Sequence, residues 1–202
     1  MLAYKVALYL HILALVLASG ATFVTKLADG RRARARTVGE ALDWHNVLLG
    51  ASKLFPISLG VFVITGSYML SVARFHVWSN GFVVAGIVGA ALLFASGAFL
   101  GIKGNALRSV LENMAKEDGA RPAPRLVPPP LVAILPMINT GIALSVVFDM
   151  VAKPASVPVA LGVMVIGAAV PAGIAMWKRP PMVAKSARVN IGASLNEEPH
   201  AP

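Results

Sequence analysis

The chain has 202 residues, of which 57% are hydrophobic and 13% charged, and it contains no cysteine. Soluble domains carry about 25% charged residues, so this composition excludes a soluble globule, and its hydrophobicity excludes a mostly disordered chain. The absence of cysteine excludes disulfides, thiolate zinc sites, iron–sulfur clusters and cysteine nucleophiles. With a net charge of +9, the composition predicts a basic integral membrane protein.

Five apolar runs have about the 20 residues that a helix needs to cross the hydrocarbon core. We predict helices because the alternating pattern of a membrane barrel is missing. The predicted spans cover residues 6–27, 54–72, 81–102, 131–151 and 157–177. The fold class is therefore an all-α transmembrane bundle over residues 1–178, followed by a tail over residues 179–202. We interpret the first run as an uncleaved span rather than a signal peptide, because its basic cluster follows the apolar part.

The basic residues predict the orientation of the spans, because cytoplasmic loops are enriched in Lys and Arg. Fifteen of them fall on one side of a five-span model (Lys26, Arg31, Arg32, Arg34, Arg36, Lys53, Lys103, Arg108, Lys116, Arg121, Arg125, Lys178, Arg179, Lys185 and Arg188), and three on the other (Lys5, Arg74 and Lys153). We therefore predict a protein of the bacterial inner membrane. Its amino terminus is expected to face the outside, and its carboxyl-terminal tail the cytoplasm. The basic clusters indicate contact with anionic lipids, and no signature of nucleic-acid binding accompanies them.

The segments between the spans are expected to contain further helix. Residues 37–53 form either an amphipathic interfacial helix or a cytoplasmic extension of the second span, and only a re-entrant course would bring His45 near the middle of the membrane. Residues 103–118 continue the third span as a polar helix, and the prolines of residues 121–130 predict an extended linker.

Gly97 and Gly101 in the third span have the small-x-x-x-small spacing that lets helices approach closely. We expect this pair to pack helices within the chain, and a subunit interface is the alternative. Asn139 and Thr140 in the fourth span are expected to bond across helices, and the alternative is that they line a cavity.

His11 is the ionisable side chain well inside the first apolar run, so it is expected to face the bundle interior. One hypothesis is a buried histidine bonded to a neighbouring hydroxyl or carbonyl, and the other is an axial haem ligand or a quinone or proton contact. A bis-histidine haem needs two imidazoles at matching depth, and His76 in the second loop is the predicted partner. The same end of the bundle also receives Arg74, Tyr68 and Asp149.

The first span, KVALYLHILALVLASGATF, has an early histidine and a late small residue, and the second, LFPISLGVFVITGSYML, has Pro56 early and Thr65-Gly66 late. In these features the chain resembles domain-of-unknown-function family 2269 of bacterial integral membrane proteins. More loosely, the first span resembles copper-resistance D-type proteins and the J-type protoporphyrinogen oxidase. In that oxidase family a first-helix histidine is associated with haem, so the resemblance implies this role for His11.

No motif of a soluble enzyme is present in the sequence, and no reaction is assigned. The leading hypothesis is a small redox-associated membrane protein that binds b-type haem through His11 and His76. The alternatives are an accessory subunit packed against other membrane subunits, and a small-molecule permease, which the odd number of spans and the missing internal repeat disfavour.

Overall fold

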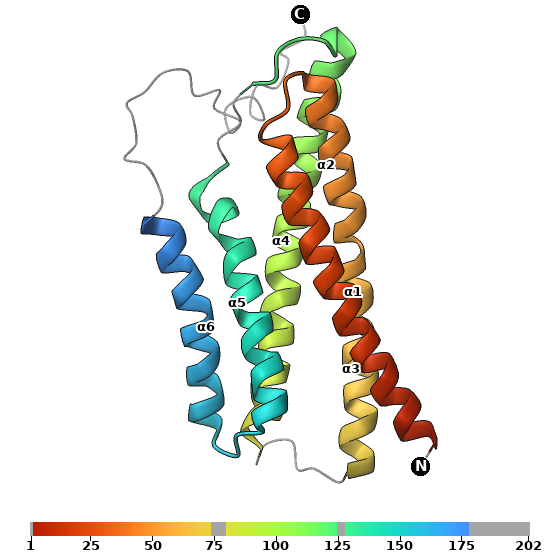
Figure 1. The fold of residues 1–202 in the computed structure, drawn as a ribbon, viewed down its shortest axis with the longest axis vertical. Coiled ribbons are helices and arrows are strands. Elements are labelled where there is room, and N and C mark those ends of the chain that lie inside the picture. The colour runs from red at the N-terminus through yellow and green to blue at the C-terminus, as the bar shows by residue number, and fades with distance from the viewer. Residues whose placement is uncertain (1, 74–79, 125–127, 178–202) are drawn as a thin grey trace, which may run out of the picture.

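The computed structural model describes residues 2–73, 80–124 and 128–177. Within these residues the chain is helical, in the order α1 (Leu2–Arg32), α2 (Val38–Ser52), α3 (Leu54–Ala73), α4 (Gly81–Asp118), α5 (Pro130–Ala152) and α6 (Val157–Trp177). Figure 1 shows these helices running up and down along one long axis. Five stretches of the described chain are long and apolar enough to cross a membrane, with α2 and α3 counted as one. The predicted all-α, multi-pass architecture is confirmed to this extent.

The connection between α2 and α3 decides between the two alternatives for residues 37–53. Only Lys53 separates the two helices, and its φ of −64° and ψ of −20° are helical. In Figure 1 they follow one another as a single long rod. The segment is therefore an extension of the second span. Thr37 is the N-cap residue of this segment, because its hydroxyl accepts the Glu40 N–H at 3.2 Å.

One end of the bundle contains α2, the last turns of α1 and the polar half of α4, and we call it the basic end (top of Figure 1). Buried Val38, Ala41 and Leu111 form a small apolar core between α2 and α4 there. The connectors on either side are paired, since Val38 N–H donates to Arg121 O and Ala123 N–H to Arg36 O, both at 3.0 Å. These bonds join the start of α2 to the chain that leaves α4.

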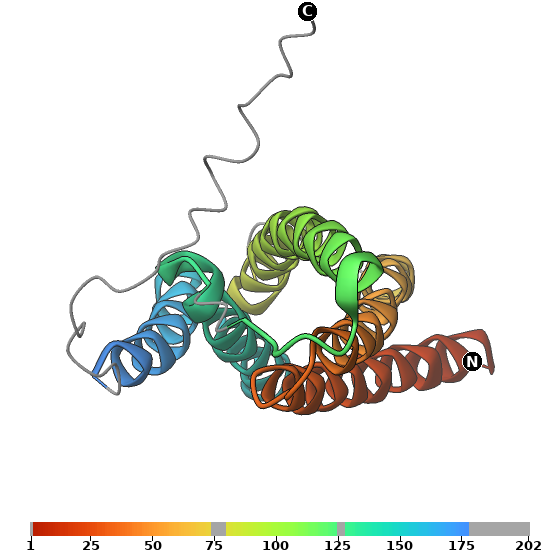
Figure 2. The same cartoon turned by 90° about the horizontal axis from the view of Figure 1, so that it is seen from above.

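At the opposite end, which we call the far end, the helices form two sets. α1 packs along α3, while α4, α5 and α6 pack on one another, and α3 and α4 touch at few positions. Seen from above, in Figure 2, α5 and α6 lie beside α4 on the side away from α3. The start of α4 is held by the turn between α5 and α6, because Gly81 N–H donates to Ala155 O at 2.9 Å. The two sets are thus joined mainly through the α2–α4 contacts at the basic end.

Glycines make close helix contacts in this chain, but at other positions than predicted. A Cβ added at Gly141 would collide with the backbone of Gly167, and one added at Gly167 would collide with Ser145, so α5 and α6 touch backbone to backbone. A Cβ at Gly97 or Gly101 would meet nothing within 4 Å. Among the described residues, the close approach expected at Gly97 and Gly101 is therefore absent, because no described helix contacts that face of α4. A contact with a second chain stays a prediction.

The surface of the helices is apolar between the two ends. Large hydrophobic side chains on every helix except α2 remain more than half exposed, among them Phe23 at 71%, Ile64 at 72% and Phe94 at 62%. Exposed apolar area on this scale requires an apolar solvent or a partner. It therefore supports a multi-pass membrane protein.

Candidate functional site

α1 packs through a stripe of alanines. Its buried residues are Ala7, Ala14, Ala21 and Ala28, one in every seven. A repeat of seven keeps one seam of a helix facing its neighbour, and the small side chains allow a close approach. The buried polar residues of α3, Ser58 and Thr65, have the same spacing. His11 lies between Ala7 and Ala14 at helical spacing, so it borders this seam between α1 and α3.

The hydrogen bond between His11 and Thr65 defines the site. His11 Nδ1 lies 2.9 Å from Thr65 Oγ1. Thr65 Oγ1 also lies 2.6 Å from the Val61 carbonyl of its own helix, which can only accept a hydrogen bond. A hydroxyl has one proton, and that proton is directed to Val61. His11 therefore donates its Nδ1–H to Thr65, which in a neutral ring leaves the lone pair on Nε2, and Nε2 has no hydrogen-bond partner among the described residues.

Two further residues of α3 confine the imidazole ring. The Phe62 ring meets it edge to face, with centroids 4.7 Å apart and planes at 81°. A Cβ on Gly66 would lie 3.7 Å from His11 Cε1, so this glycine borders the ring on the same helix. His11 thus faces α3 and bonds to a neighbouring hydroxyl, as the first hypothesis expects, while a ligand-binding role for it stays a prediction. These contacts restrict rotation of the ring and fix which nitrogen is available.

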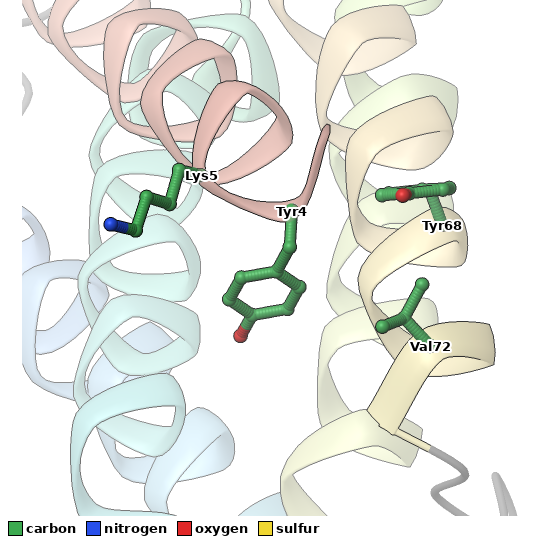
Figure 3. Close-up of a pocket in the computed structure, with 4 residues that line it drawn as sticks. All are labelled: Tyr4, Lys5, Tyr68 and Val72. Carbon is green, nitrogen blue, oxygen red and sulfur yellow. The ribbon is translucent and has the colours of Figure 1, made fainter. Parts of the chain in front are cut away.

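A cavity of about 350 Å³ opens between α1 and α3 toward the far end, lined by Tyr4, Lys5, Tyr68 and Val72. Figure 3 shows that the Tyr4 ring projects between α1 and α3, while the Lys5 side chain extends away from α3. Tyr4 lies seven residues before His11, about 10 Å along the helix. The cavity therefore lies on the same seam as the His11–Thr65 pair.

His45 has a different role from His11. It is 2% exposed, and its Nε2 lies 2.8 Å from the Gly104 carbonyl of α4. Because a carbonyl only accepts, Nε2 carries the proton, and Nδ1 has no partner among the described residues. A Cβ on Gly104 would come within 2.9 Å of Leu49 Cδ2, so glycine permits this approach. His45 is thus a contact between α2 and α4 at the basic end, as its predicted depth required.

Asp149 is a second buried polar group, in the last turn of α5. Its side chain is fully buried, and neither carboxylate oxygen has a hydrogen-bond partner among the described residues. It shares a buried helix face with Ser145, whose hydroxyl reaches the Val163 carbonyl of α6 at 3.2 Å. Asp149 and Tyr68 therefore lie toward the same end, as expected, but in different helix sets. A buried carboxyl that has no hydrogen-bond partner among the described residues of an apolar helix is unusual enough to mark a candidate functional position.

The structure describes only some of the remaining residues that the sequence analysis singled out. Arg74, His76 and the tail with His200 lie outside the described residues, so the His11–His76 pair stays a prediction. Asn139 does bond across helices, since it accepts the Ser96 hydroxyl at 2.9 Å, whereas Thr140 bonds to Pro136 in its own helix. No three His, Asp or Glu side chains gather as a metal site in the described part of the chain.

Sequence reasoning missed the contributions of Thr65, Phe62 and Tyr4 to the site. The available signal was the spacing of seven residues, shared by the alanines of the first span and by Ser58 and Thr65 of the second. Two helices with small or hydroxyl side chains at that interval are expected to pack along those faces.

Comparison with known proteins gives no family assignment. No family model, curated protein or solved structure matches this chain. The resemblance of the first two spans to families of bacterial membrane proteins therefore stays a prediction, and the seam between α1 and α3 is the candidate site on structural grounds alone.

Proposed function

We propose that this multi-pass membrane protein binds a b-type haem through His11 and takes part in electron transfer or in haem or metal handling. The observation that carries the proposal is the hydrogen bond to Thr65. Histidines that bind metals donate their other ring N–H to an acceptor, which fixes the tautomer and orientation. Thr65 supplies that acceptor, and His11 Nε2 is left with the lone pair that iron requires.

The residues around His11 fit this role in three ways. Thr65 holds the ring in one tautomer, and Phe62 packs against it, so the nitrogen donor is positioned before any ligand binds. The cavity lined by Tyr4 and Tyr68 lies farther along the same seam and provides an aromatic, apolar wall for a planar group. A bound haem would supply one-electron chemistry. The second imidazole of a bis-histidine site would come from His76.

The test is an absorption spectrum of the full-length protein purified from haem-replete cells. We expect a Soret band and the reduced-state bands of a low-spin b-type haem, which His11→Ala abolishes. Thr65→Val keeps the side-chain shape but removes the acceptor, so we expect haem affinity to fall about 10–100-fold. His76→Ala should remove or shift the bands as well, and His45→Ala should leave them intact. A colourless wild-type protein would disprove the proposal.

We also propose that the basic end faces the cytoplasm of a bacterial inner membrane, with the amino terminus outside. The support is the charge distribution: Lys5 and Lys153 are the cations of the far end among the described residues, and the basic end holds the clusters of α1 and α4. A topology reporter fused after Pro202 is expected to act as cytoplasmic, and one inserted near Ser79 as external. The reverse pattern would overturn the orientation.

An accessory subunit is the second candidate function. The observation that favours it is the face of α4 with Gly97 and Gly101, where an added Cβ meets nothing within 4 Å. Small residues on an uncovered helix face permit close approach of another helix. The absorption spectrum separates the two candidates, because a purely packing subunit has no haem bands.

A further inference from the structure

A second cavity, of about 190 Å³, lies at the basic end, well away from His11 along the bundle. It is lined by Lys26, Leu27, Gly30, Arg31 and Arg34. Gly30 and Arg31 follow Lys26 and Leu27 by about one turn of α1, so these four residues lie on one side of the helix. The chain turns immediately after the helix, where Arg34 N–H donates to Arg31 O at 3.0 Å. That turn returns Arg34 to the same face and brings three cations around one cavity.

The basic residues that line this cavity form no ion pair with the described part of the protein. Asp29, the acidic residue of the same helical turn, pairs with Arg32 at 2.6 Å. In the described part of the chain, no ion pair involves Lys26, Arg31 or Arg34. Gly30 leaves the middle open, because an added Cβ would meet nothing within 4 Å. The cavity therefore has the charge and the access that an anionic group needs.

Arg31 is held in place by an aromatic ring of the next helix. Its guanidinium carbon lies 5.7 Å from the centroid of Trp44, within the range of a cation–π contact. The two residues thus connect α1 to α2 through a residue that lines the cavity. The arrangement also places a fluorescent side chain against a residue of the proposed site.

The surroundings of the cavity select a lipid rather than a free anion. Leu27 forms part of its wall and is 48% exposed, and Phe23, one turn toward the middle of the bundle, is 71% exposed. Basic residues next to an apolar helix surface lie at the level of the headgroups, where each attracts anionic lipid. A phospholipid can place its phosphate among the cations and its acyl chains along Phe23.

We propose that Lys26, Arg31 and Arg34 form a binding site for the headgroup of an anionic phospholipid at the basic end of the bundle. The phosphate is bound by the two guanidinium groups and the ammonium group, which suit phosphate oxygens. The site depends neither on haem nor on His11, so its test is separate from that of the proposed function.

The experiment uses Trp44 as the reporter. The full-length protein with Trp78→Phe and Trp177→Phe, in a neutral detergent, is titrated with short-chain phosphatidylglycerol, short-chain phosphatidylcholine or inorganic phosphate. We expect phosphatidylglycerol to cause a saturable change in Trp44 fluorescence, and phosphatidylcholine and inorganic phosphate to cause none. Lys26→Gln and Arg34→Gln should each weaken binding about fivefold.

Lys116→Gln is the matched control, because Lys116 is an exposed cation at the same end, in the last turn of α4. It is expected to leave the binding curve unchanged. An equal loss in this variant would mean a diffuse charge effect and would overturn the proposal. Saturation by inorganic phosphate would show an anion site without lipid preference, and an absent or unsaturable signal would show that no site exists. Either result would also overturn it.

Discussion

Gly167→Leu is expected to destabilise the protein by about 3 kcal/mol or more, because overpacking of a tight contact forces the backbones apart. A Cβ at this position would collide with the Ser145 hydroxyl and lie 2.9 Å from the Gly141 carbonyl. A leucine would therefore separate α5 from α6 along their closest contact. Thermal unfolding in detergent measures the loss, and Gly141→Leu should show the same result from the other helix.

Gly97→Leu and Gly101→Leu are the matched controls for this prediction. They make the same chemical change in α4, where an added Cβ meets nothing within 4 Å. We expect their stability to stay within about 0.5 kcal/mol of wild type, as for surface positions. Equal losses at all four glycines would show that α4 is packed against a helix that the described arrangement does not contain.

Asp149→Asn is expected to stabilise the protein by about 1 kcal/mol or more. The carboxyl is fully buried and makes no hydrogen bond among the described residues, so none of them offsets the cost of burying this polar, ionisable group. The amide keeps the shape and cannot ionise. In a chain of this size, that gain corresponds to a rise in Tm of about 2–4 °C.

Asp118→Asn provides the comparison for Asp149→Asn. Asp118 is exposed at the end of α4, and its carboxylate accepts the Ala120 N–H at 3.0 Å, which an amide oxygen can also do. We expect no rise in Tm for this variant. A fall in Tm for Asp149→Asn would mean that the carboxylate has a bonding partner in the folded protein.

The helices follow closely from the sequence because their signals are local. Apolar length predicted the spans, and α3, α5 and α6 begin and end within about one residue of the expected limits, inside the usual uncertainty of helix ends. α1 extends beyond its apolar run to Leu2 and Arg32, since a helix continues into water while its residues favour helix. The polar half of α4 was predicted on the same grounds.

Packing between helices was less predictable, because it depends on which faces meet. Gly97 and Gly101 have the expected spacing but no close neighbour in the described part of the chain, whereas Gly141 and Gly167 meet across α5 and α6 without forming such a motif with one another. Within one apolar helix, composition does not distinguish the lipid side from the protein side. The depth of His11 was predictable, but its partner Thr65 became identifiable only when α1 and α3 were aligned.

The paired connectors at the basic end impose an order on how the protein is assembled. During synthesis the amino-terminal helices emerge first, and α1 can pack on α3 once residues up to 73 have been made. The backbone partners of Val38 and Arg36, however, are Arg121 and Ala123, more than eighty residues later in the chain. The backbone groups at the start of α2 therefore lack these partners until the chain beyond α4 has been made, so the first three helices gain their final contacts at the basic end only after the fourth.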